Sequence, residues 1–242
     1  MRTLAGQRKF AVFDIDGTLI RWQLYHAIFH ELAKGGKLPK AEAEAVKAAR
    51  ATWKQRGHRE SFKSYEHILW QTYMNAITTL DEHDVESAVN TVFETYKDQV
   101  YTYTRDLIRQ LKADGYLLFT LSGSHQEIVA KLAEYYGFDD AAGTVYLKEN
   151  GTFTGKEDSV LGDKGAALKR LAEKHGASWQ DSIAVGDSKS DAKMLELVER
   201  PIAFNPDQQL LDIATTKGWD IVVERKNVIY QLHQADGHYI LA

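Results

Sequence analysis

The sequence of 242 residues contains no cysteine and only three prolines. Without cysteine, disulfides, thiolate catalysis and cysteine-type zinc sites are excluded, and the composition fits a reducing compartment. With so few prolines and no low-complexity stretch, no segment has the composition of a linker between domains. The organisation of the chain therefore has to be inferred from its pattern of strands and helices.

Long hydrophobic runs and an excess of positive charge are also lacking. No stretch approaches the roughly 18 apolar residues that a membrane span needs, and residues 1–9 lack the apolar region of a signal peptide. The net charge is −4, so we expect neither a basic face for nucleic acid nor a polybasic segment for a membrane surface. We expect a cytoplasmic protein without nucleic-acid or membrane partners, and the oligomeric state stays open.

The first predicted element of the chain is an apolar strand at residues 10–13, and the polar turn of residues 14–18 follows it. Since the strand is apolar without alternation, we expect both of its faces to be buried, as in a parallel sheet. Residues 21–102 then predict helices throughout, because apolar residues recur at spacings of three and four and no convincing strand interrupts them.

Beyond residue 102, strands and helices alternate, which predicts a doubly wound parallel sheet. The expected strands are residues 116–121, 182–185, 201–204 and 219–223, with a hairpin around Asn150–Gly151. The first strand belongs to the same sheet, so the helical block is an insertion after it. We therefore predict an α/β core of residues 1–20 and 103–242, with an all-helical cap of residues 21–102.

Polar residues of catalytic type follow three of the expected strands. They are Asp14 and Asp16, then Ser122 and Gly123, then Asp187 with Asp191. Ligands of open α/β sheets bind beyond the carboxyl ends of the strands, so these residues converge if the strands are neighbours. Four carboxylates in one crevice repel one another and need raised pKa values or a cation. Mg²⁺ is the natural partner, since this hard ion is held by carboxylates, waters and substrate phosphate.

Asp14, Asp16 and Lys164 together predict the transfer of a phosphoryl group. Aspartate is a known nucleophile toward phosphorus, so we expect Asp14 to form an aspartyl phosphate. Asp16 would protonate the leaving oxygen and later activate water. Lys164, near the predicted start of a helix, would bind phosphate oxygens together with the Ser122 hydroxyl and the Gly123 N–H.

The segment Phe13–Leu19, Phe-Asp-Ile-Asp-Gly-Thr-Leu, resembles the first motif of the haloacid dehalogenase superfamily. Ser122 resembles its second motif, Lys164 its third and the segment Gly186–Asp191 its fourth. An all-helical insertion between the first two motifs is similar to subfamily IB, the phosphoserine-phosphatase-like branch. The resemblance covers nearly the whole chain and implies a Rossmann-like core with a cap of the C1 type.

The same resemblance implies an activity and a role for each acidic residue. The activity is that of a Mg²⁺-dependent phosphatase, hydrolysing a small phosphorylated metabolite through an aspartyl phosphate. Asp14 is then the nucleophile and Asp16 the general acid and base. The Mg²⁺ is held by Asp14, the main-chain carbonyl of Asp16 and Asp187, while Asp191 supports the metal shell.

One position departs from the phosphoserine phosphatases. Those enzymes place a glutamate nine residues after the nucleophile, where it meets the substrate amine, and this chain has Gln23 there. No arginine clearly matches the one that binds the substrate carboxylate, although Arg56 and Arg59 are candidates. We expect Gln23 and His26, nearly one helical turn apart, to contact a substrate other than phosphoserine.

Three alternatives stay open. The protein is a phosphoserine phosphatase proper, or it passes the phosphoryl group to an alcohol other than water. A different class is a phospho-accepting signalling module similar to a response-regulator receiver, which also joins acidic residues, a hydroxyl and a lysine around Mg²⁺. Receivers are much shorter, and the Asp14-x-Asp16 spacing with a long helical insertion favours an enzyme with turnover.

Overall fold

The computed structural model describes residues 7–56, 58 and 61–241. The chain forms two compact units. The sheet unit comprises Met1–Gln23, Tyr96–Thr144 and Ser159–Ala242, and the helical unit comprises Leu24–Thr95 and Val145–Asp158.

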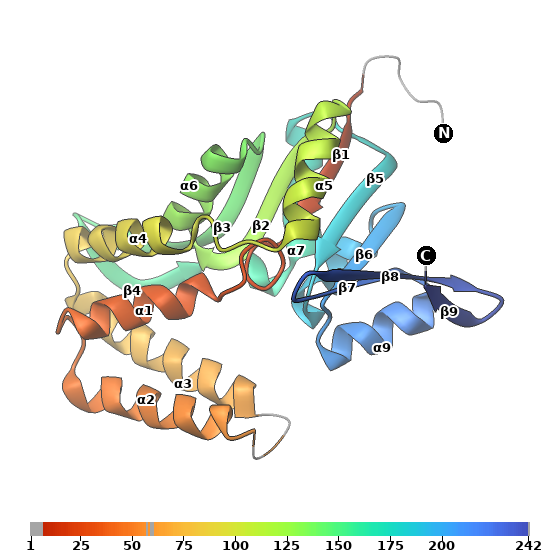
Figure 1. Cartoon of the computed structure of the whole chain (residues 1–242). Helices are drawn as coiled ribbons and strands as arrows, with labels where there is room; N and C mark the ends of the chain where they lie inside the picture. The colour runs from red at the N-terminus through yellow and green to blue at the C-terminus, as the bar shows by residue number, and fades with distance from the viewer. Residues whose placement is uncertain (1–6, 57, 59–60, 242) are drawn as a thin grey trace. The chain divides into compact units, whose positions relative to one another are not determined.

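A sheet with parallel strands at its centre forms the middle of the sheet unit (Figure 1). The strands follow the order β3-β2-β1-β5-β6-β7-β8-β9. Their bounds are β1 Lys9–Phe13, β2 Leu117–His125, β3 Asp140–Glu149, β5 Ser178–Gly186, β6 Arg200–Phe204, β7 Asp220–Arg225, β8 Val228–Ala235 and β9 His238–Leu241. Pairing is parallel from β3 to β7, and β8 and β9 extend the sheet antiparallel.

The central position of β1 follows from its sequence. Its last four residues are fully buried, so the strand needs cover on both faces and partners on both edges. Phe13 lies opposite Thr120 of β2 and Val185 of β5. Because these three strands run in the same direction, the residues that follow them emerge at one edge of the sheet.

Helices cover both faces of this sheet. They are α5 Thr102–Ala113, α6 Gln126–Tyr136, α7 Lys164–Lys174, α8 Ala192–Leu195 and α9 Gln208–Lys217. One core cluster joins Phe10 and Val12 of β1 to side chains of α7, α8 and α9, so these helices share one face. Figure 1 shows α5 in front of β1 and β2, on the other face.

The helical unit contains α1 Leu24–Lys34, α2 Lys40–Lys54, α3 Ser61–Ala76 and most of α4 Glu82–Tyr96. A hairpin of the second half of β3 and of β4 (Thr152–Asp158) belongs to the same unit. The rings of Tyr146 and Tyr73 meet edge to face at 5.3 Å between centroids, and Lys148 pairs with Glu82. These contacts explain why the hairpin groups with the helices.

The predicted α/β fold with a doubly wound, largely parallel sheet is confirmed. The predicted domain boundaries stay a prediction, and the contacts of the structure divide the chain differently. Residues 145–158, predicted in the core, group with the helices, whereas residues 21–23 and 96–102 group with the sheet. No helix of the described residues is long and apolar enough to cross a membrane.

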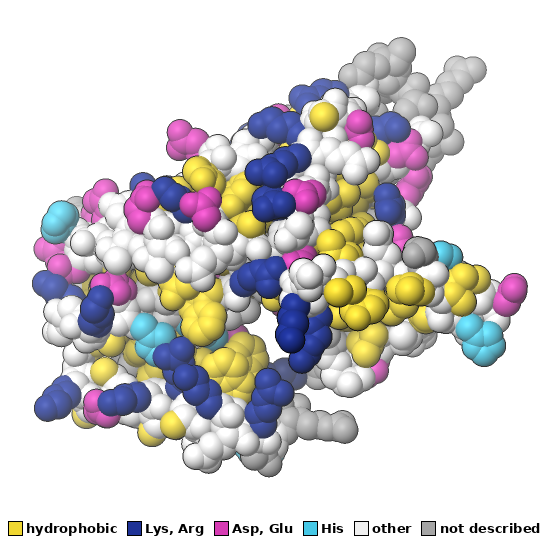
Figure 2. Space-filling view, viewed as in Figure 1, with side chains coloured by type: hydrophobic (Ala, Val, Ile, Leu, Met, Phe, Trp, Pro, Cys, Tyr) yellow, Lys and Arg dark blue, Asp and Glu magenta, His cyan; other side chains and the backbone are white. Residues whose placement is uncertain are grey.

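The sequence did not predict α9, β8 or β9. Strands β8 and β9 carry little of the alternation that marks a half-buried strand, because most of their side chains are exposed. Figure 2 shows hydrophobic side chains on the surface of these strands. They include Val228, Ile229, Tyr230, Ile240 and Leu241.

Candidate active site

The loop after β1 carries the proposed nucleophile. The main-chain N–H of Asp14 donates to the carbonyl of Val185 at 2.9 Å, so the pairing of β1 with β5 continues to this residue. The N–H groups of residues 18–20 all donate to the carbonyl of Ile15, which folds the chain back on itself. Asp14 is 4% exposed, so its carboxylate lies buried at the carboxyl edge of the sheet.

Lys164 bridges two carboxylates at this edge. Its Nζ donates to Oδ1 of Asp14 at 2.7 Å and to Oδ1 of Asp191 at 2.6 Å. The lysine begins α7, and Asp163 caps that helix by accepting from the N–H of Ala166 at 3.0 Å. Burial alone would lower the pKa of Lys164, but the two carboxylates outweigh it and raise the pKa above its ordinary value. The lysine is therefore a fixed buried cation.

Asp191 is held by donors on both of its oxygens. While Lys164 binds Oδ1, the main-chain N–H groups of Asp187 and Ser188 donate to Oδ2 at 3.1 and 3.0 Å. The hydroxyl of Ser188 also donates to Oδ2, at 3.2 Å. Asp191 thus orients both the lysine and the loop that carries Asp187.

Asp14, Asp187 and Asp191 each place a carboxylate oxygen within 4.8 Å of the other two. Burial raises the pKa of Asp14 to about 7; Asp191 and Asp16 add to this rise, and Lys164 opposes it. Burial and then the charge of Asp14 raise the pKa of Asp187 well above its ordinary value. Lys164 therefore does not balance these carboxylates, and a second cation would be favoured among them.

The chemistry of these donors fits a hard divalent cation. Carboxylate oxygens are the ligands that Mg²⁺ prefers, usually one or two of them with waters. Two glycines permit the close approach of the loops. A Cβ on Gly17 would lie 2.1 Å from Oδ2 of Asp187, and a Cβ on Gly186 would lie 2.5 Å from Cβ of Asp191.

Ser122 and Asp16 meet at the same edge. The hydroxyl of Ser122, which is fully buried, donates to Oδ2 of Asp16 at 2.6 Å and accepts from the N–H of Ser124 at 2.9 Å. Gly123 lies next to Leu161, because an added Cβ would come within 2.7 Å of that side chain. The structure thus brings Asp14, Asp16, Ser122, Lys164, Asp187 and Asp191 to one edge of the sheet.

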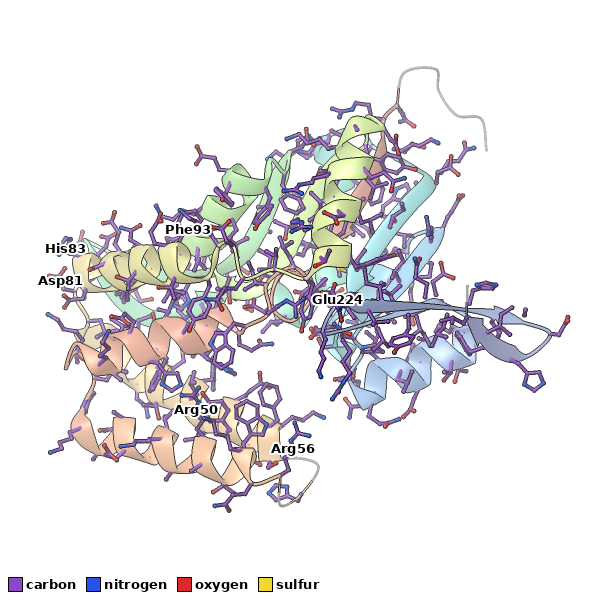
Figure 3. The ribbon with its side chains drawn as sticks, viewed as in Figure 1. Arg50, Arg56, Asp81, His83, Phe93 and Glu224 are labelled. Atoms are coloured by element: carbon purple, nitrogen blue, oxygen red, sulfur yellow. The ribbon has the colours of Figure 1, made fainter. Side chains whose placement is uncertain are left out.

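The role of Gln23 and His26 as substrate contacts stays a prediction. Gln23 is half-buried and directly precedes α1. His26 is 5% exposed and packs against Tyr65 at 5.1 Å between ring centroids, inside the helical unit. Arg56 is exposed just after α2 (Figure 3), and Arg59 lies outside the described residues.

Sequence reasoning placed Ser188 in the fourth motif but gave it no role of its own. Its hydroxyl and the Asp191 carboxylate form a reciprocal capping box around the short 3-10 helix Lys189–Asp191. The sequence does carry a signal for this, because Ser-x-x-Asp has the spacing of a capping box.

Comparison with known proteins assigns the chain to a family. A model of the haloacid dehalogenase-like hydrolases matches residues 11–196, a span that includes Asp14, Lys164 and Asp191. The chain belongs to this hydrolase family. The family match extends through the helical insertion, so it favours an enzyme over a phospho-accepting signalling module.

Two relatives of this hydrolase are similar along most of its length. The phosphoserine phosphatase of Methanocaldococcus jannaschii is 26% identical over 225 residues, which are 92% of this chain and 95% of the relative. The phosphoserine phosphatase of Archaeoglobus fulgidus is 25% identical over 215 residues, which are 88% of this chain and 57% of the relative. The chain spans about half the length of several curated relatives that it matches.

Solved structures show the same fold. A phospho-aspartyl intermediate analogue of phosphoserine phosphatase gives a TM-score of 0.62 at 22% identity, covering 91% of this hydrolase and 95% of that chain. A protein of unknown function from Bordetella pertussis Tohama I gives a TM-score of 0.68 at 23% identity, and the match covers 89% of this hydrolase and 98% of that chain. At these identities the likeness concerns the fold alone.

Proposed function

We propose that this hydrolase is a Mg²⁺-dependent phosphatase that removes the phosphate of a small phosphorylated metabolite through an aspartyl phosphate on Asp14. The observation that carries the proposal is the bridge of Lys164 between Asp14 and Asp191, with Asp187 within 4.8 Å. A buried cation beside three carboxylates suits an anionic group that arrives at a negative nucleophile.

Asp14 and Asp16 divide the chemistry between them. An oxygen of Asp14 attacks phosphorus while the bond to the leaving oxygen breaks, and Asp16 supplies the proton that this oxygen takes up. Asp16 then accepts a proton from the water that attacks phosphorus, which frees the Asp14 carboxylate. Ser122, now 2.6 Å from Asp16, would exchange this bond for one to a phosphate oxygen.

The remaining residues hold charge in place. Lys164 would stabilise the phosphate oxygens and the N–H of Gly123 would donate to them. Asp14, Asp187 and the main-chain carbonyl of Asp16 would hold Mg²⁺, and Asp191, whose oxygens are already engaged, would support this shell. The bound ion would supply charge neutralisation between nucleophile and phosphate.

Substitution of the nucleophile tests the proposal. We expect Asp14→Asn to abolish turnover of a panel of phosphomonoesters with Mg²⁺ while the fold stays intact, because an amide of nearly the same size does not attack phosphorus. Chelation should abolish wild-type turnover, and Mg²⁺ but not Ca²⁺ should restore it. Retention of more than about a hundredth of wild-type turnover in Asp14→Asn would rule out this nucleophile.

Phosphoserine phosphatase is the second candidate, because the relatives from Methanocaldococcus jannaschii and Archaeoglobus fulgidus carry that name. Gln23 argues against phosphoserine as the substrate, since a neutral amide does not balance the charge of the phosphoserine ammonium group. Comparison of kcat/KM in wild type and in Gln23→Glu separates the two. We expect wild type to prefer another phosphomonoester and Gln23→Glu to shift toward phosphoserine, and a wild-type preference for phosphoserine above about tenfold, some 1.4 kcal/mol, would favour this second candidate.

Transfer to an alcohol is a further candidate at the same site. Its product would be a new phosphate ester in place of inorganic phosphate, so quantifying both products with added alcohols decides between water and alcohol as acceptor.

A further inference from the structure

A buried carboxylate with no part in the proposed chemistry lies near the candidate active site. Glu224 lies near the end of β7 (Figure 3). Its side chain is only 1% exposed. The strands β1, β5, β6 and β7 are parallel neighbours, so Glu224 and Asp14 lie toward the same edge of the sheet. Burial of a carboxylate is unfavourable unless donors compensate it, so its partners reveal what holds it there.

Three donors surround the Glu224 carboxylate. The guanidinium of Arg21 donates through Nη2, and the main-chain N–H groups of Thr102 and Tyr103 donate at 3.1 and 2.9 Å. Helix α5 begins at Thr102, and Tyr101 provides no side-chain cap. Glu224 therefore caps α5 from 122 residues away, where the N–H groups and the helix dipole favour a negative charge.

The same carboxylate anchors the two segments, residues 20–23 and 96–101, that precede the helical unit and return from it. The N–H of Arg21 donates to the carbonyl of Gln99 at 2.8 Å, and the N–H of Tyr101 donates to the carbonyl of Leu19, just before the first segment, at 3.0 Å. The Nε of Arg21 donates to the carbonyl of Val100 at 2.7 Å, and its guanidinium lies 4.6 Å from the centre of the Tyr101 ring. Arg21 thus joins both segments to Glu224.

The helix that Glu224 caps contacts the loop of Asp14. The hydroxyl of Thr104 in α5 donates to the carbonyl of Thr18, in the loop after Asp14, at 2.9 Å. On the other side, the main-chain N–H of Glu224 donates to Oδ1 of Asn205 at 2.9 Å, a bond that a substitution of the Glu224 side chain retains.

We propose that Glu224, paired with Arg21, is a positioning residue that keeps the loop of Asp14 in one arrangement. This inference rests on the proposed phosphatase function. Loss of the pair loosens this loop and lowers kcat by the same factor for every phosphomonoester. KM changes little, because neither side chain belongs to the group proposed to bind substrate.

The test uses Glu224→Gln, Arg21→Gln and the double variant, with Asp220→Asn as the control. Asp220 pairs with Arg200 at the opposite end of β7, at 3.6 Å and with both side chains partly exposed. We expect each single variant to lower kcat about tenfold, a moderate effect for a displaced catalytic group. The kcat of the double variant should be no lower than that of the less active single variant, because the two residues act as one unit. The control should keep wild-type kcat.

A second measurement does not depend on turnover. Amide hydrogen exchange in residues 14–23 and 96–105 should accelerate in Glu224→Gln relative to exchange in α9, because Thr102 and Tyr103 lose a charged acceptor. If Glu224→Gln does not fold, Arg21→Gln serves alone, since the Arg21 side chain is 38% exposed and its removal leaves the two N–H donors on Glu224.

Each outcome decides the proposal. The proposal would be overturned by wild-type kcat in the folded single variants or by multiplicative losses of kcat in the double variant. An equal loss of kcat in Asp220→Asn would also overturn it, because the loss would then follow from breaking any ion pair of β7. Unchanged exchange in residues 14–23 would also overturn it. Absence of wild-type turnover on all phosphomonoesters would contradict the proposed function instead, and the exchange rates would then decide on the role of Glu224.

Discussion

At the scale of single residues, Lys164 determines the charge balance of the site. Replacing it with methionine leaves Asp14 and Asp191 buried without their shared cation, and breaking a buried pair in this way costs about 3–5 kcal/mol. We expect Lys164→Met to lose this much free energy of unfolding in urea at neutral pH, and to lose turnover.

Lys174→Met is the matched control for that variant. Lys174 also pairs with a carboxylate, that of Asp140 at 2.8 Å, but its side chain is 66% exposed. An exposed pair contributes about 0–1 kcal/mol. Equal losses in the two variants would contradict the role given to Lys164.

His125 predicts a dependence of stability on pH. Burial lowers the pKa of this histidine to about 3, so at mildly acidic pH the unfolded chain binds a proton that the folded chain does not. The contribution of His125 to the free energy of unfolding therefore falls as the pH drops below the ordinary histidine pKa, by about 2 kcal/mol between about pH 7.5 and pH 5.

Comparison with His125→Asn isolates that effect. Asp14 and Asp187 have raised pKa values and change stability in the opposite direction, but they are present in both proteins. Urea unfolding at the two pH values should show the wild type losing about 2 kcal/mol more than the variant. Parallel losses would mean that His125 is protonated in the folded protein.

At the scale of elements, the turn after β1 depends on a glycine. Gly17 has φ +83°, and a Cβ there would lie 2.1 Å from Oδ2 of Asp187. Gly17→Ala should therefore displace Asp187 and lower kcat about a hundredfold, as expected for a displacement near 1 Å. Steady-state turnover with Mg²⁺ measures this loss.

Gly115→Ala separates the contact from the backbone effect. Gly115 has nearly the same φ, +82°, with nothing within 4 Å of the added Cβ. The Gly115→Ala variant should lose about 1 kcal/mol of its free energy of unfolding, the usual cost of a non-glycine residue in the left-handed region. Its turnover should stay that of the wild type. A hundredfold loss in both variants would show that the contact with Asp187 is not the cause.

At the scale of the whole molecule, the hairpin of residues 145–158 depends on the helices. Its side chains Tyr146 and Phe153 are 5% and 4% exposed. Removal of residues 24–95 alone should expose these side chains to water. Removal of residues 24–95 together with residues 145–158 should leave a sheet unit that is more stable than the one that keeps the hairpin. The ends of both gaps lie close together, because the hydroxyls of Thr144 and Ser159 are 3.0 Å apart and the rings of Trp22 and Tyr96 stack at 6.2 Å.

Thermal unfolding and binding of a hydrophobic dye compare the two truncated proteins. The protein without both segments, closed by short glycine-serine turns, should have the higher Tm and bind less dye. If it aggregates while the protein that keeps the hairpin folds, the hairpin belongs to the sheet unit in solution.

Much of the fold and of the site could be predicted from the sequence. The apolar run before Asp14 and the alternation beyond residue 102 predict a parallel sheet, because burial of a strand on both faces leaves a local signal. Parallel strands end at one edge, so polar residues at strand ends predict that Asp14, Asp16, Ser122 and Asp187 meet.

Contacts across long stretches of chain could be decided only by the tertiary structure. The hairpin around Asn150–Gly151 was predicted, but its grouping with the helices depends on Tyr73 and Glu82, far away in sequence. Likewise, nothing near Glu224 indicates that it caps α5 or pairs with Arg21. Local patterns determine which strands and helices form and where their ends lie, whereas the partner of a buried charge depends on which distant donors the completed fold brings to it.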